Sequence, residues 1–134
     1  MRSKTVLILD RDLGFVFWLG QNLDRAGHQA YPAKSTADAI TLLGRFHLDI
    51  DLLVVNPALD GALSLANTLM QSHRDLKVLV TSQGDVPPDR KSVAWHSWKR
   101  KPAALDRRTA KEWLEAIEQV CSPSVHSWMH GVVV

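Results

Sequence analysis

Seven polar residues of this sequence stand where short apolar runs end, and together their types could handle a phosphoryl group. They are Asp10, Arg11, Asp12, Asn56, Thr81, Ser82 and Lys101. Carboxylates can hold Mg²⁺, and a hydroxyl and an ammonium can bind phosphoryl oxygens. This chemistry requires a fold that brings the seven residues to one place, so it depends on the elements that precede them.

The apolar runs have the composition of buried strands. Five segments are predicted as strands, at 6–9, 28–33, 52–55, 77–81 and 93–99. Most of the intervening segments carry apolar residues at helical spacing, as at Phe15, Leu19 and Leu23. Strands that alternate with helices form a parallel sheet covered by helices. We therefore predict an α/β, flavodoxin-like (βα)5 three-layer sandwich.

The composition of the strands also predicts their order. The runs 6–9 and 52–55 are the most apolar and should be central, whereas the weaker segment 28–33 should lie at an edge. With right-handed crossovers, these positions favour a parallel five-stranded sheet of order 2-1-3-4-5. Its pocket would lie at the carboxyl ends of the first and third strands, where Asp10 and Asn56 stand.

Local signals mark the helix ends. Ser35 begins a pattern like a capping box, and Asp106 is placed to cap the last helix. Asp60 or Gly61 opens the helix after the third strand. Gly27 stands where a helix C-terminus favours a left-handed residue. The Pro-Pro pair at 87–88 excludes a helix interior, so a helix between the last two strands should be short.

Composition limits the class of protein. The 134 residues suit one domain, at 1–121, followed by a tail at 122–134. A net charge of +2 does not argue for nucleic acid as a partner, which we do not expect, and no apolar run is long enough for a membrane span. The single cysteine, Cys121, excludes an internal disulfide. We expect a cytoplasmic domain without membrane contact.

Over residues 4 to about 121, the chain resembles the receiver domain of two-component response regulators. The resemblance rests on KTVLILDRD, on GHQAYPAKSTADAI, on DLLVVN with ALDG after it, on KVLVTS and on KRKP. The order and spacing of these segments support the resemblance more strongly than any single segment does. The resemblance implies a signalling module, and it implies a role for each of the polar residues.

Asn56 takes the position of the phosphoacceptor aspartate. Asp10 and Arg11 take those of the acidic pair that binds Mg²⁺, with Asp12 as a candidate substitute for the second acid. The remaining positions implied by the resemblance are the conserved hydroxyl at Thr81, the conserved lysine at Lys101 and, at Trp98, the aromatic residue whose rotamer reports activation.

Two departures from the family's pattern change the expected chemistry. An amide oxygen is a poor nucleophile toward phosphorus, so Asn56 cannot form the acyl phosphate that a carboxylate forms. Asn56 also removes a negative charge from the metal site, and Arg11 adds a positive charge beside it. Mg²⁺ normally keeps one or two carboxylates, so these changes argue against its binding. We predict a pseudo-receiver that is not an enzyme and has no cofactor, in which Arg11 and Lys101 pair with Asp10 or Asp12.

Plainer interpretations stay open for the same residues. Asn56 could be a turn residue before Pro57, and Arg11 could point to solvent. Thr81 and Ser82 could satisfy backbone groups at a strand end.

Other functions also stay open. The chain could be a true phosphoacceptor that uses Asp10, Asp12 or Asp60, or a flavodoxin-like enzyme that binds a nucleotide or flavin. Against the enzyme, the loop DRDLGF lacks a Gly-rich phosphate cradle.

The resemblance implies a protein partner, such as a histidine kinase, another regulator or a second copy in a homodimer. The family's usual output surface would carry Trp98 and Lys99 here. The densest basic cluster comprises Lys99, Arg100, Lys101, Arg107, Arg108 and Lys111. A solvated face is its simplest interpretation, an acidic protein partner comes next, and nucleic acid is third.

Overall fold

A computed structural model describes residues 3–83 and 95–122 of the chain. In chain order the elements are β1 (Thr5–Leu9), α1 (Leu13–Arg25), β2 (Gln29–Ala33), α2 (Thr36–Phe46), β3 (Leu52–Val55), α3 (Ala62–Ser72), β4 (Lys77–Ser82), β5 (Ser97–Arg100) and α4 (Arg107–Cys121). The predicted short helix around 87–88 and the tail beyond 122 lie outside the described residues. None of the described helices is both long enough and apolar enough to cross a membrane.

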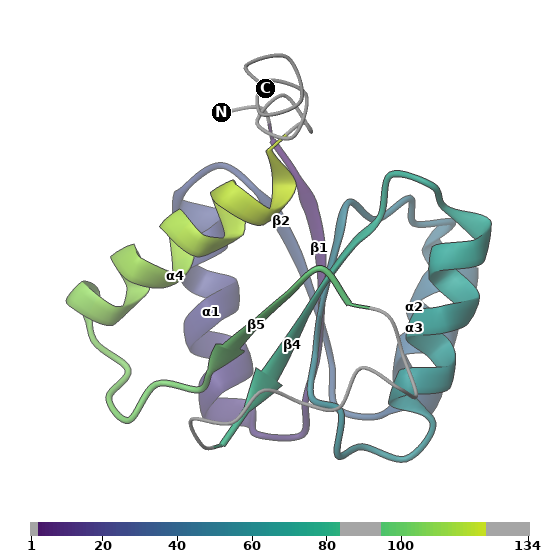
Figure 1. The fold of residues 1–134 in the computed structure, drawn as a ribbon, viewed down its shortest axis with the longest axis horizontal. Helices are drawn as coiled ribbons and strands as arrows, with labels where there is room; N and C mark the ends of the chain where they lie inside the picture. Colours follow the sequence, from purple (N-terminus) through teal and green to yellow (C-terminus); the bar gives the residue numbers. More distant parts are fainter. Residues whose placement is uncertain (1–2, 84–94, 123–134) are drawn as a thin grey trace, which may run out of the picture.

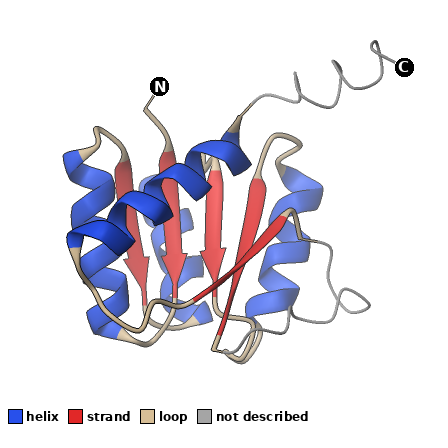
Figure 2. Ribbon diagram, turned by 60° about the vertical axis from the view of Figure 1, so that its left-hand side comes forward, coloured by secondary structure: helices blue, strands red, loops and turns tan. Residues whose placement is uncertain are grey.

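The five strands form one parallel sheet in the order β2-β1-β3-β4-β5, which confirms the predicted fold class and strand order (Figure 2). β1 and β3 lie inside the sheet and β2 lies at an edge, as their compositions predict. The last strand was predicted too early, at 93–99. Its ladder with β4 instead runs from Ser97 to Arg100.

Two helical layers enclose the sheet, with α1 and α4 on one face and α2 and α3 on the other (Figure 1). Because side chains alternate along a strand, each strand supplies both layers. In β1, Val6 and Ile8 face α1 and α4, whereas Leu7 and Leu9 face α2 and α3. The continuous apolar runs of the sequence are thus explained by burial on both faces.

The helix ends follow their local signals. The Ser35 hydroxyl accepts a hydrogen bond from Asp38 N–H at 3.1 Å, and Asp106 accepts one from Thr109 N–H at 2.9 Å. Gly27 has a φ of 91° directly after Ala26, the C-cap of α1, as predicted. Of the two candidates for the start of α3, Gly61 is the N-cap, with a φ of 73°.

Side chains also cap the amino edge of the sheet. In three places the residue just before a strand accepts a backbone N–H from the neighbouring chain segment. The acceptor and donor pairs are His28 Nδ1 with Lys4 at 3.0 Å, Asp51 Oδ2 with Thr5 at 2.9 Å, and His96 Nδ1 with Val78 at 2.9 Å. These bonds satisfy donors that the parallel ladder leaves over.

The two histidine caps predict a pH dependence, because a ring nitrogen that accepts a hydrogen bond cannot also carry a proton. Burial lowers the pKa of His28 and of His96, although Glu118 opposes the effect at His28 and Lys77 adds to it at His96. The unfolded chain therefore binds protons first, below its ordinary histidine pKa of about 6.5. Stability should be complete above that pH and fall as the pH drops below it.

The measurement is urea unfolding at pH values between about 5 and 8. The midpoint of the native chain should fall toward acid pH. The variant H28N/H96N should show a flatter profile, since asparagine keeps an acceptor that does not titrate. H47N, at an exposed left-handed helix end, is the matched control and should keep the native slope. Parallel profiles for all three chains would contradict the assignment.

Candidate functional site

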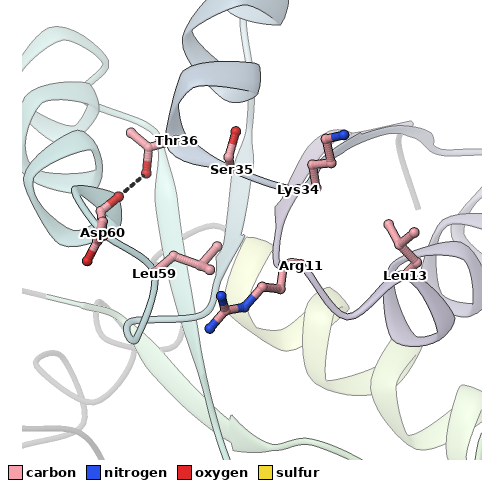
Figure 3. Close-up of a pocket in the computed structure, with 7 residues that line it drawn as sticks. All are labelled: Arg11, Leu13, Lys34, Ser35, Thr36, Leu59 and Asp60. Atoms are coloured by element: carbon pink, nitrogen blue, oxygen red, sulfur yellow. Dashed lines mark hydrogen bonds between the residues drawn. The ribbon is translucent and has the colours of Figure 1, made fainter.

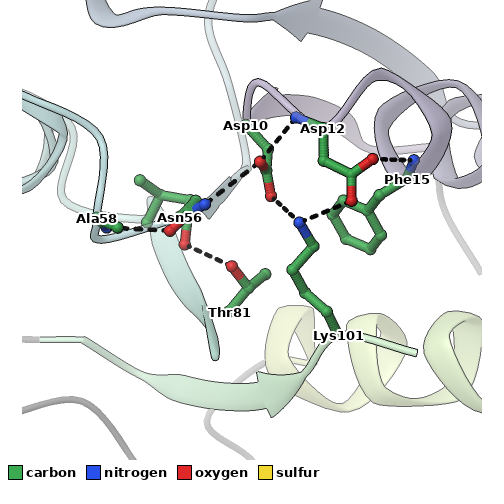
Figure 4. Close-up of polar contacts among 8 residues, drawn as sticks. Asp10, Asp12, Phe15, Asn56, Ala58, Thr81 and Lys101 are labelled. Atoms are coloured by element: carbon green, nitrogen blue, oxygen red, sulfur yellow. Dashed lines mark hydrogen bonds and ion pairs between the residues drawn. The ribbon is translucent and has the colours of Figure 1, made fainter. Parts of the chain in front are cut away.

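Three of the predicted residues form a polar centre at the carboxyl end of the sheet (Figure 4). The ammonium of Lys101 lies 2.9 Å from Asp10 Oδ2 and 3.1 Å from Asp12 Oδ2. The side chains of Asp10 and Lys101 are only 2% and 8% exposed, whereas that of Asp12 is 53% exposed. Lys101 therefore bridges one buried and one half-exposed carboxylate.

Backbone hydrogen bonds fix the three side chains in these positions. Asp10 directly follows β1, and its N–H donates to the carbonyl of Ala33 at 3.0 Å. The other oxygen of Asp10 accepts the N–H of Asp12 at 3.0 Å. Asp12 in turn caps α1 by accepting the N–H of Phe15 at 3.3 Å. Lys101 directly follows β5, and its N–H donates to Ser82. The ends of β1 and β5 thus position the two carboxylates and the Lys101 ammonium close to one another.

Lys99 and Lys101 lie over an aromatic platform that was not predicted from the sequence. The Lys101 ammonium lies 5.0 Å from the centre of the Phe15 ring, and that of Lys99 lies 5.5 Å from the Trp113 ring. The two rings pack edge to face at 5.3 Å, which joins α1 to α4. The spacing of Lys99 and Lys101, two residues apart on a strand, was the signal that both face the same layer.

Asn56 takes part in the centre and in the turn that follows β3. Its Nδ2 donates to Asp10 Oδ1 at 3.3 Å, and its Oδ1 accepts the N–H of Ala58 at 3.0 Å. A carboxylate could make the second bond but not the first, because it has no hydrogen to donate. Asn56 therefore serves as a turn residue before Pro57 and also contacts the buried acid Asp10.

Arg11 lies elsewhere, so the predicted pairing of Arg11 with Asp10 or Asp12 is wrong. The structure gives Arg11 no ion pair with either acid, and its exposed side chain reaches toward Leu59 (Figure 3). Asp10 turns into the centre at the strand end, and its neighbour Arg11 turns outward. Lys101 already lies between the two carboxylates.

The remaining predicted residues lie around the centre. Thr81 is buried, and its hydroxyl donates to the Val55 carbonyl at 3.5 Å, which agrees with the plainer interpretation of a strand-end hydroxyl. Trp98 is half-buried against the core beneath α2 and α3. Lys99 faces the opposite layer. Among the described residues, no group of three or more His, Cys, Asp or Glu side chains is arranged to hold a metal ion.

The pKa of Asp12 provides a direct test of the contribution of Lys101 to the centre. The hydrogen bond from Lys101 lowers the pKa of Asp12, and the bond from Phe15 N–H adds to the effect. Because the folded pKa is depressed, this pairing stabilises the fold above the ordinary carboxyl pKa of about 4 and is lost as the pH falls further. In K101M, we expect the pKa of Asp12 to rise toward its ordinary value in an NMR titration.

Asp106 is the matched control for that titration. Hydrogen bonds from Thr109 lower the pKa of Asp106 at a second helix N-terminus. It has no contact with Lys101 among the described ion pairs, so its titration should be unchanged in K101M. An Asp12 titration that stays in place would show that Lys101 does not set the charge of the centre.

The sequence matches no protein-family model, and no curated protein matches it. Solved structures do match the fold. An orphan response regulator of H. pylori has a TM-score of 0.71 at 21% identity, over 90% of this chain and 98% of that chain. A response regulator from Thermotoga maritima has a TM-score of 0.69 at 24% identity, over 91% and 100% of the two chains.

A third match is a response regulator from Burkholderia pseudomallei, whose structure contains a phosphorylated aspartic acid, a calcium ion and citrate. Its TM-score is 0.70 at 19% identity, over 96% of this chain and 72% of that chain. These similarities show that the chain shares the fold of response regulators.

Proposed function

We propose that this chain is a receiver-like module of two-component signalling that is not phosphorylated at position 56 and acts through contacts with proteins. The partner would be a histidine kinase, another regulator or a second copy of the chain. The observation that carries the proposal is the Lys101 ammonium, seated between Asp10 and Asp12 at 2.9 and 3.1 Å.

Charge supports the proposal. The two carboxylates and one ammonium leave the centre with a single negative charge, and Asn56 adds none. Mg²⁺ prefers oxygen ligands in octahedral geometry. Here the buried oxygen of Asp10 has no hydrogen-bond partner among the described residues beyond the Lys101 ion pair, and its other oxygen faces two N–H donors. The Lys101 ammonium already compensates the charge of these carboxylates, and this supports our proposal that the centre works without Mg²⁺.

The nucleophile supports the proposal as well. Acyl phosphate formation needs a carboxylate oxygen that can attack phosphorus. The amide oxygen of Asn56 is instead bound to the N–H of Ala58, and its nitrogen donates to Asp10. Both ends of the amide are therefore used to hold one conformation, which suits a fixed docking module.

The test is incubation with Mg²⁺ and acetyl phosphate, followed by the mass of the intact protein. We expect no gain of a phosphoryl group. A stable adduct would reject the proposal. If that adduct disappeared in D12N, the chain would be a phosphoacceptor that uses another acid; Asp12 is the acid of the centre whose side chain is half-exposed. D60N would test Asp60 in the same way.

A further inference from the structure

A pocket of about 430 Å³ opens beside the polar centre, between the loops that follow β1, β2 and β3 (Figure 3). Two cations, Arg11 and Lys34, line it together with the apolar side chains of Leu13 and Leu59. Asp60 is the acid of the lining, so cations outnumber acids there. The pocket is distinct from the Asp10–Lys101 centre, since neither of those residues lines it.

The cations of this pocket are available to a ligand. In the described part of the chain, neither Arg11 nor Lys34 forms an ion pair or a side-chain hydrogen bond. The acids nearest to Arg11 in sequence, Asp10 and Asp12, are both held by Lys101. A guanidinium placed beside two acids but paired with neither can serve a partner without a cost to the fold.

An exposed apolar strip continues from the pocket across the start of α1. Leu13, which lines the pocket, is 50% exposed, and Phe17, one turn further along α1, is 57% exposed. Leu105, 45% exposed, lies over Gly14, where a Cβ atom would come within 3.8 Å of its side chain. Leu105, in the loop before α4, thus lies beside the residue that follows Leu13.

Cations also stand at the far end of the strip. Arg107 and Arg108 open α4, whose first turn holds no acidic residue. Positive charges at a helix N-terminus oppose the helix dipole, so they do not serve the stability of α4. Neither arginine forms an ion pair with the described residues. The strip thus has cations at both ends.

We infer that this strip binds an acidic segment of a partner protein, with an apolar side chain of that segment seated beside Leu13 and Leu59 and its carboxylates facing Arg11 and Lys34. The inference rests on the proposed function, because it names the chemistry of the protein partner. Charge complementarity selects an acidic partner. The apolar centre favours protein over nucleic acid, whose contacts are made mainly to phosphates.

The experiment uses two fluorescein-labelled peptides of equal length and equal negative charge. Both are rich in glutamate; one carries leucines at helical spacing and the other carries serines there. By fluorescence anisotropy, the leucine peptide should bind on the order of tenfold more tightly than the serine peptide. R11E/K34E should weaken its binding on the order of tenfold or more. R45E, an exposed charge reversal at the opposite end of α2, is the matched control and should bind as the native chain does.

Three results would overturn the inference. These are equal affinity for the two peptides, no measurable binding of either, or a duplex DNA of equal charge that binds more tightly and loses its affinity in R11E/K34E. Unfolding curves of the variants show whether weaker binding comes from the changed surface or from loss of the folded structure. The proposed function is tested by phosphorylation and this inference by peptide binding, so either one can fail without the other.

Discussion

Replacing Lys101 with methionine is expected to lower the free energy of unfolding by about 3–5 kcal/mol, the usual cost of removing one partner of a buried ion pair. The Asp10 side chain is 2% exposed and would lose the cation at 2.9 Å. Methionine keeps most of the aliphatic stem, so the loss is one of charge more than of packing. Urea unfolding at neutral pH measures it.

K99M is the matched control, because Lys99, two residues before Lys101, faces the same helical layer and also lies over an aromatic ring, at 5.5 Å from the centre of Trp113. It has no ion pair to a buried acid among the described contacts, so its loss should cost only about 0.5–1 kcal/mol. The double variant D10N/K101M should recover much of the loss of K101M, since no buried charge is then left alone. Equal losses in K99M and K101M would contradict the role of the buried pair.

Replacing Asn56 with aspartate is expected to destabilise the metal-free protein by about 1.5–3 kcal/mol, the typical contribution of a hydrogen bond to a charged group. The substitution removes the amide donor to Asp10 and puts a second negative charge where the donor now lies, 3.3 Å from Asp10 Oδ1. Like charges at such a distance repel strongly in a buried site. Unfolding in the presence of EDTA measures this effect.

The same variant should respond to Mg²⁺, whereas the native chain should not. Three carboxylates and one ammonium leave a charge of −2, which a divalent ion can neutralise. Mg²⁺ should therefore raise the unfolding midpoint of N56D, by the linkage between binding and stability. N67D makes the same change on α3 and should show neither effect. A metal-free N56D as stable as the native chain would show that the amide is not required by Asp10.

Much of the fold could be predicted because the strands are buried on both faces. The runs at 6–9 and 52–55 had no other place than the middle of a parallel sheet, and the caps at Ser35 and Asp106 confirm their local signals. The proximity of Asp10, Asn56 and Lys101 could then be predicted, because the carboxyl ends of parallel strands meet at one edge of the sheet.

The direction of the Arg11 side chain could not be predicted, because the sequence does not say which of the two cations, Arg11 or Lys101, pairs with Asp10 and Asp12. The structure shows that the position of Lys101 after β5 decides the pairing, since its ammonium lies between the two carboxylates. The start of β5 was also missed. The apolar residues Val93 and Trp95 placed it early by composition, whereas its ladder with β4 starts at Ser97.

The centre joins the first strand of the chain to the last. Asp10 follows β1, but the ammonium that neutralises it follows β5. During synthesis on the ribosome, the segment that carries Asp10 emerges long before its counter-ion. Burial of a lone carboxylate is costly, so the carboxyl end of β1 should stay hydrated until β5 joins the sheet. Because this contact between Asp10 and Lys101 joins segments far apart in sequence, we expect it to form late in folding.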